Sequence, residues 1–225
     1  MCFSAEASFV AGAALLPAGG YCVYQAIRKK PSALVLAVVP LFFGIQQISE
    51  GFVWHALEHG DTEQTRTGSL IFLFFALAVW PFWFALVAAI MEPSPPRRRW
   101  FFVLAVLTTG WFWVLYYPLL VGPDSYLQIQ IVHHSIQYRF PDLAIHQYIP
   151  RPLLRSLYMV SVALPMCLGS EKWGIIPGLV LGASAVVALL VFDYAFISVW
   201  CFFGAILAGY LCYIFGRLPV VAKTT

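Results

Sequence analysis

Charged residues are scarce in this chain of 225 residues. It contains 13 Lys and Arg and 10 Asp and Glu, so 10% of the residues are charged, whereas 61% are hydrophobic and the mean hydropathy is +0.83. Soluble globular domains carry roughly 25% charged residues because their surface faces water. The composition excludes a water-soluble monomer and predicts one integral membrane domain over residues 1–225, with the lipid bilayer as its main partner. The formal net charge of +3 is too small to indicate a nucleic-acid partner.

Seven hydrophobic segments are long enough, or nearly so, to cross a bilayer as helices. About 20 apolar residues cross the ~30 Å hydrocarbon layer. Charged and proline-containing stretches, such as residues 28–31 and 92–99, separate the segments. We therefore predict an all-α bundle of seven transmembrane helices at residues 5–27, 33–57, 69–91, 100–121, 153–168, 173–192 and 195–215.

Lysine and arginine are unevenly distributed between the two ends of these segments. Alternation of the spans places nine on one side and four on the other, the four being Arg66, Arg139, Arg151 and Arg155. Because cytoplasmic loops hold the excess of Lys and Arg, we expect the N-terminus outside and the C-terminus in the cytoplasm of a cell membrane. The first segment lacks a basic n-region and an Ala-x-Ala cleavage site, so we expect a retained anchor and not a signal peptide.

Residues 122–152 form the longest polar stretch between spans. Hydrophobic and polar residues alternate over 127–131 and again over 136–140, which is typical of half-buried strands. A two-stranded ribbon is not stable alone, so it must pack on helix ends. We predict a short extracytoplasmic β-hairpin between the fourth and fifth helices, which covers the bundle as a lid and faces it with Ile129, Ile131, Ile136 and Tyr138.

A polar stripe lies in the outer half of the second span. Gln46 and Gln47 lie one turn before Glu50 on the same helix face, and Trp54 lies one turn after it. A carboxyl group at this depth is costly unless it is paired or protonated. Two roles remain open: Glu50 is a catalytic or ligand-binding group in an outward-facing pocket, or it is a neutral acid that joins helices by hydrogen bonds.

The five histidines of the chain fall on or near the outer half. Residues 55–59 match the His-x-x-Glu-His pattern of zinc proteases, but no third ligand is identifiable, which favours a solvated helix end for His55. His133 and His134 lie in the predicted turn, where they supply a metal ligand or a pH-sensitive group. These three histidines are the candidate ligands for a transition metal such as zinc.

Cys2 is the one cysteine of five that lies on the outer side, which excludes an intrachain disulfide there. If Met1 is removed, its thiol and α-amine together suit metal chelation or nucleophilic catalysis; the alternative is an interfacial thiol packed on the bundle. Ser4 is well placed to cap the first helix. We expect Cys2 and Ser4 to fold inward and line a pocket with Gln46, Gln47 and Glu50.

Residues 1–9, Met-Cys-Phe-Ser-Ala-Glu-Ala-Ser-Phe, resemble the opening of a family of uncharacterised, mostly bacterial, multi-pass membrane proteins. Residues 40–47, 50–54 and 198–203 are also similar to that family. The resemblance covers nearly the whole chain. It implies a multi-pass helical membrane protein and carries no established activity.

The last span contains neither lysine nor histidine, which excludes two known classes of seven-span membrane protein. A retinal protein needs a Schiff-base lysine there, and every lysine of this chain lies at a helix end or in a loop. Membrane hydrolases of the alkaline ceramidase and adiponectin-receptor type place His-x-x-x-His in the last span, which has no histidine here. The second span only partly resembles theirs, through Ser49 and His55.

The predicted function is binding of a metal or small ligand in the outward-facing pocket, with metal-dependent hydrolysis in which Glu50 is the base. One alternative is a proton-coupled transporter or permease in which Glu50 carries the proton. Another is a non-catalytic assembly subunit. The later spans contain no counterpart of the Gln-Gln-x-x-Glu stripe, which argues against a transporter built from inverted repeats.

Overall fold

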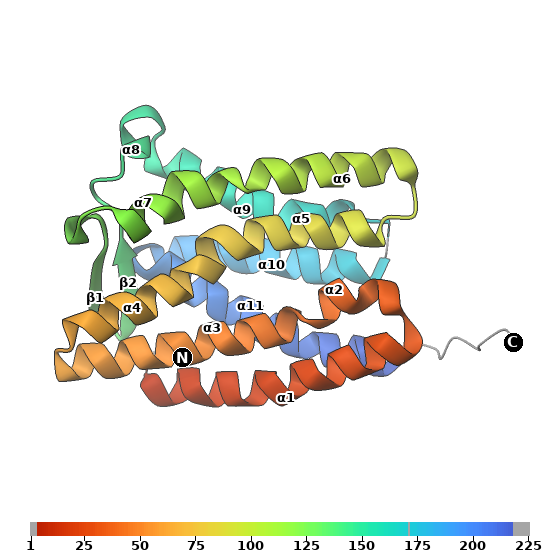
Figure 1. The fold of residues 1–225 in the computed structure, drawn as a ribbon, viewed down its shortest axis with the longest axis horizontal. Coiled ribbons are helices and arrows are strands. Elements are labelled where there is room, and N and C mark those ends of the chain that lie inside the picture. The colour runs from red at the N-terminus through yellow and green to blue at the C-terminus, as the bar shows by residue number, and fades with distance from the viewer. Residues whose placement is uncertain (1–3, 171, 218–225) are drawn as a thin grey trace, which may run out of the picture.

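Roughly parallel helices run along the molecule and a β-hairpin crosses one end of them (Figure 1). The computed structural model describes residues 4–170 and 172–217. The hairpin lies at the same end as the start of helix α1 (Ala5–Lys29), whereas α11 (Phe196–Arg217) runs to the opposite end. The long helices thus run between the same two ends of the molecule, and the side of a membrane on which each end lies stays a prediction.

Three of the long helices are interrupted by short segments of other geometry. The first of them consists of the 3₁₀ turn η1 (Pro31–Ala33), α2 (Leu34–Ala37) and α3 (Val39–His59). The next consists of α4 (Thr62–Leu73), the π-helix η2 (Phe74–Val79) and α5 (Trp80–Met91). The third consists of α6 (Pro95–Thr108), the π-helix η3 (Phe112–Tyr116) and α7 (Tyr117–Val121).

The second half of the chain contains the hairpin and three further helices. In order these elements are the 3₁₀ turn η4 (Asp124–Tyr126), β1 (Gln128–Val132), β2 (Ser135–Arg139), α8 (Ile145–Tyr148), α9 (Arg151–Leu168), α10 (Lys172–Val191), the 3₁₀ turn η5 (Asp193–Ala195) and α11.

Five helices of the described chain are long and apolar enough to cross a membrane, namely Ala5–Lys29, Pro31–His59, Thr62–Met91, Pro95–Val121 and Asp193–Arg217. They correspond to the first four and the last of the predicted spans. The other two predicted spans correspond to α9, which carries Arg151 and Arg155 near its start, and to α10, whose apolar part Ile175–Val191 is shorter. The chain is thus helical with several membrane-compatible helices, and the count of seven stays a prediction.

Local sequence explains where the helices at the hairpin end begin and end. Gly60 ends α3 with φ +70°, a left-handed conformation that favours glycine. The next residue, Asp61, caps α4 because its carboxylate accepts a hydrogen bond from the Gln64 N–H at 2.9 Å. Ser4 caps α1 as predicted, accepting from the Ala7 N–H at 3.3 Å.

Glycines let neighbouring helices pack backbone to backbone. A Cβ atom on Gly12 of α1 would lie 2.5 Å from the side chain of Ile48 on α3, and one on Gly204 of α11 would lie 2.7 Å from the ring of Phe43. Both distances are too short for a real side chain. Close approach at small residues is the usual basis of helix association in membranes, so these contacts hold α1, α3 and α11 together.

The predicted hairpin is present. Strands β1 and β2 pair antiparallel, with Gln128 opposite Arg139 at the open end. The turn residues His133 and His134 both have positive φ, 46° and 56°, which is the signature of the tight type I′ turn that matches strand twist.

The hairpin faces the bundle with fewer residues than predicted. Ile136 and Tyr138 of β2 are buried and Ile129 of β1 is half-buried, but Ile131 is 42% exposed. Strand β2 packs on α11 and η5, whereas β1 is the outer strand and contacts α4. Because Ile131 lies beside the turn on that outer strand, the prediction that it faces the bundle is wrong.

A buried carboxylate joins two turns at the opposite end of the bundle. Glu92 is 2% exposed and accepts hydrogen bonds from the Ser94 N–H (3.2 Å) and from the N–H (3.1 Å) and hydroxyl (2.7 Å) of Ser170. Arg97 lies 3.9 Å from this carboxylate and donates to the Leu168 carbonyl. Burial raises the pKa of Glu92, but the hydrogen bonds and the Arg97 charge outweigh it, so the pKa is lowered.

Replacing Glu92 by Ala should lower the free energy of unfolding by about 1–3 kcal/mol, because the hydrogen bonds that Ser94 and Ser170 donate to a charged acceptor are lost. Since the folded pKa of Glu92 is lowered, its contribution is present above the ordinary glutamate pKa and is lost as the pH falls through the folded value. Unfolding of the detergent-solubilised protein at pH 7 and at acidic pH measures both effects. The control is Glu58→Ala, at an exposed residue of α3; an equal loss in both variants would contradict the assignment.

Candidate functional site

Gln46 links several helices in the interior of the bundle. It is fully buried on α3, and its Oε1 atom accepts a hydrogen bond from Trp80 Nε1 at 2.8 Å. Its Nε2 atom donates to the Phe72 carbonyl at 3.4 Å and to Cys201 Sγ at 3.2 Å. The amide therefore joins α3 to α4, α5 and α11 at one point.

Glu50 faces the interior of the bundle, as its position on the polar stripe predicts. It is fully buried, and its Oε1 atom accepts a hydrogen bond from the hydroxyl of Ser198 on α11 at 2.6 Å. This bond crosses between two helices and fits the predicted role of an interhelical acid. The role of Glu50 as a catalytic base stays a prediction.

The other two residues of the stripe are buried with fewer bonds. Neither amide atom of Gln47 has a hydrogen-bond partner among the described residues, and the same holds for Trp54 Nε1. Both side chains are at most 3% exposed. The stripe thus forms a polar interior along α3, and its role in ligand binding is still a prediction.

The histidines predicted as metal ligands occupy the ends of elements. His55 lies 4.2 Å from His59, ring to ring, at the exposed end of α3. His133 lies edge-on to Tyr194 at 5.5 Å, and His134 is exposed at the hairpin tip. Within residues 4–170 and 172–217, no three His, Cys, Asp or Glu side chains are placed to hold a metal ion.

Cys2 lies outside the described residues, so its predicted role as nucleophile or metal ligand stays a prediction. Ser4 is described, and its hydroxyl is engaged in capping α1. Ala5, the first residue of α1, belongs to the same buried cluster as Trp54 and Cys201. The first residue of α1 therefore packs in one cluster with residues of α3 and α11, and the inward fold of the segment that holds Cys2 stays a prediction.

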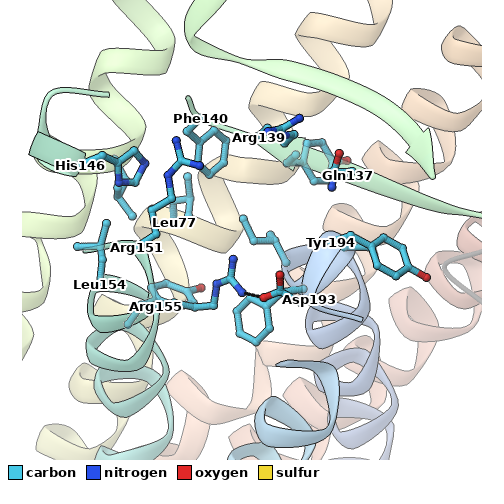
Figure 2. A pocket seen from close by; sticks show the side chains of 16 residues that line it. Leu77, Gln137, Arg139, Phe140, His146, Arg151, Leu154, Arg155, Asp193 and Tyr194 are labelled. Atoms are coloured by element: carbon cyan, nitrogen blue, oxygen red, sulfur yellow. Dashed lines mark hydrogen bonds and ion pairs between the residues drawn. The ribbon is translucent and has the colours of Figure 1, made fainter. Parts of the chain in front are cut away.

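A cavity of about 500 Å³ opens at the hairpin end of the bundle. It lies between β2, the start of α9 and the turn η5 that leads into α11 (Figure 2). Its volume is in the ordinary range for sites that bind small molecules. Gln46, Gln47 and Glu50 do not line it, so this cavity is separate from the polar stripe.

Three arginines and one acidic residue line this cavity, namely Arg139 on β2, Arg151 and Arg155 on α9, and Asp193 on η5. Arg155 forms an ion pair with Asp193 (Figure 2), and its guanidinium lies 5.4 Å from the ring centre of Phe196. Arg151 donates to the Pro141 carbonyl at 3.3 Å. Arg139 and Arg151 thus keep their positive charge without an acidic partner in the described lining.

His146 of α8 lies on the same side of the cavity as Arg151 (Figure 2). Burial and the nearby charge of Arg151 lower the pKa of His146, and a backbone hydrogen bond with Phe140 offsets only part of this. The imidazole is therefore neutral at pH 7, because its ordinary pKa is already about 6.5. A bound anion would favour its charged form.

The inner part of the cavity wall is mostly apolar and less exposed than the charged part. Its apolar residues include Leu77 of η2, Leu115 of η3, Leu154 and Tyr158 of α9, and Phe196 and Ile197 of α11. Tyr158 also donates its hydroxyl to the Ala76 carbonyl of η2. Both π-helices thus contribute to this wall, and π-helical segments occur frequently at functional sites.

A family model described as a family of unknown function (DUF6629) matches residues 1–224. The chain belongs to this family. Membership in DUF6629 confirms the predicted placement among uncharacterised proteins. No curated protein and no solved structure matches the chain.

The arginines of the cavity were predicted only as basic residues of the outer side. One signal was present in the sequence: Arg151 and Arg155 are four residues apart and share a helix face, at the start of a segment that is otherwise apolar. Their proximity to Arg139 and Asp193 depends on how the hairpin and η5 fold over α9. No pattern in the sequence predicts this contact between distant segments.

Replacing Gln46 by Ala should destabilise the bundle by about 1–3 kcal/mol, because Trp80 Nε1 loses its buried acceptor. Thermal unfolding of the purified protein, followed by tryptophan fluorescence, measures the loss. Gln64→Ala is the matched control, since Gln64 is exposed in the first turn of α4. Unfolding of Gln46→Ala at the parent temperature would show that these hydrogen bonds do not stabilise the bundle.

Proposed function

We propose that this member of DUF6629 is a seven-helix integral membrane protein that binds a small anionic ligand in an outward-facing cavity. The observation that carries the proposal is the lining of the 500 Å³ cavity by Arg139, Arg151 and Arg155 with Asp193 as the acidic residue. Guanidinium groups present paired donors that match the oxygen atoms of carboxylates and phosphates.

Helices α9 and α10 complete the seven spans in this proposal. Both run alongside the other long helices (Figure 1), with α9 packed on α5 and α10, and α10 packed on α11. The basic residues Arg28, Lys29, Lys30, Arg97, Arg98, Arg99 and Arg217 lie at or near helix ends away from the hairpin. Their excess supports a cytoplasmic assignment for that end and an outer assignment for the hairpin and its cavity.

Cysteine labelling in intact cells tests this orientation. Gln147→Cys, in the exposed part of α8, should react with a membrane-impermeant maleimide when Cys2 is replaced by Ser. Arg98→Cys, at the start of α6, should react only after the membrane is permeabilised. The opposite labelling pattern would overturn the proposed orientation.

The charge of the cavity favours an anion over a metal cation. Two guanidinium charges without an acidic partner repel cations, and the described lining offers only Asp193 and His146 as metal-ligating side chains. The proposal does not depend on Glu50, which lies outside that lining. Hydrolysis or proton-coupled transport by Glu50 would be a separate activity of the polar stripe.

Anion binding is measured with the purified full-length protein in nanodiscs of zwitterionic lipid, by titration calorimetry with sodium sulfate against chloride of equal ionic strength. We expect sulfate to bind, and we expect Arg151→Gln and Arg155→Gln each to weaken binding by about tenfold or more, since a hydrogen bond to a charged group is lost.

The control is Arg98→Gln, which changes an exposed arginine at the other end of the molecule and should leave sulfate affinity unchanged. Size-exclusion profiles identify any variant that fails to fold. Absence of sulfate binding by the parent, or equal affinities of the parent and both cavity variants, would overturn the proposal.

A further inference from the structure

We infer that the ligand of this cavity is an amphiphilic phosphomonoester, with a dianionic head at the arginines and a short apolar group against the buried wall. The inference rests on the proposed function and names the class of its ligand. Its basis is the division of one continuous cavity into a charged part and an apolar part.

The charged part fits a dianion. Of the three arginines, Arg155 is paired with Asp193, whereas Arg139 and Arg151 have no acidic partner in the described lining. A phosphomonoester carries close to two negative charges near neutral pH, which matches these two free charges. A monoanion would leave one of them uncompensated.

Exposure of the lining residues orients the ligand. Arg139 and Arg151 are exposed, whereas Leu115, Leu154 and Phe196 are 6%, 7% and 4% exposed. The charged groups therefore stand at the open side and the apolar groups on the inner side. A ligand that is polar throughout would leave these apolar side chains without the gain of burying apolar surface.

The volume limits the length of the apolar group. A water molecule occupies about 30 Å³ in the liquid, so a cavity of about 500 Å³ has room for a phosphate and a chain of several carbon atoms. The cavity therefore takes either a soluble phosphate ester or the head and first carbons of a membrane lipid. Both sources present the same chemistry to the site.

Calorimetry of the full chain in zwitterionic nanodiscs with inorganic phosphate, hexyl phosphate and hexanol tests the inference. The affinity for hexyl phosphate should be at least about tenfold higher than the affinity for phosphate. Burial of two methylene groups is enough for a roughly tenfold gain in affinity. Hexanol should not compete. Leu154→Ala should reduce the advantage of hexyl phosphate and leave phosphate affinity unchanged, whereas Leu153→Ala, at a 52% exposed neighbour, should change neither.

Equal affinities for phosphate and hexyl phosphate would overturn the inference of an amphiphilic ligand and would leave the proposed anion site unaffected. Binding of neither probe, together with no binding of sulfate, would overturn the proposed function as well. If Leu154→Ala does not fold, Leu115→Ala replaces it. Phosphatidic acid added to the nanodiscs distinguishes the sources: competition with hexyl phosphate assigns a lipid headgroup, and unchanged hexyl phosphate affinity assigns a soluble ester.

Discussion

Polar side chains inside this apolar bundle are costly unless they form hydrogen bonds within the protein, because hydrocarbon offers none. Gln46 meets the requirement by bonding to Trp80, Phe72 and Cys201 across several helices, and Glu50 meets it through Ser198. These bonds fix how α3 faces α4, α5 and α11. The turn η5 leads directly into α11, so this packing also sets the position of η5 at the cavity.

The charged groups at the two ends of the bundle have different partners. At one end Glu92 is buried but receives hydrogen bonds from Ser94 and Ser170 and the charge of Arg97, so it can remain ionised. At the hairpin end the three arginines of the cavity outnumber its one carboxylate, and of these arginines only Arg155 has an acidic partner in the described lining. The charge of Glu92 is thus compensated within the protein, whereas Arg139 and Arg151 of the cavity keep charge that suits an external ligand.

The sequence predicts those features that depend on local pattern. Hydropathy identifies the helices, alternation identifies the hairpin, and the cost of a buried carboxyl group places Glu50 toward the interior. It does not reveal that Ile131 is exposed, because that depends on which strand lies outermost. Nor does it reveal the cavity, because Arg139, Arg155 and Asp193 come from three distant segments that meet only after the hairpin packs on α11.

One side chain, Tyr158, both lines the inner wall of the cavity and joins two helices by a hydrogen bond. Tyr158 lines the cavity with its ring and bonds its hydroxyl to the Ala76 carbonyl in η2. Its ring also packs edge-on against Trp111 and Trp200 at 5.6 Å. The carbonyls of a π-helix are displaced from the regular α-helical pattern, and a buried donor stabilises that displacement. The inner wall is therefore held by the same internal hydrogen bonding that orders the bundle, whereas exposed arginines at the open side retain the freedom to adjust to a ligand.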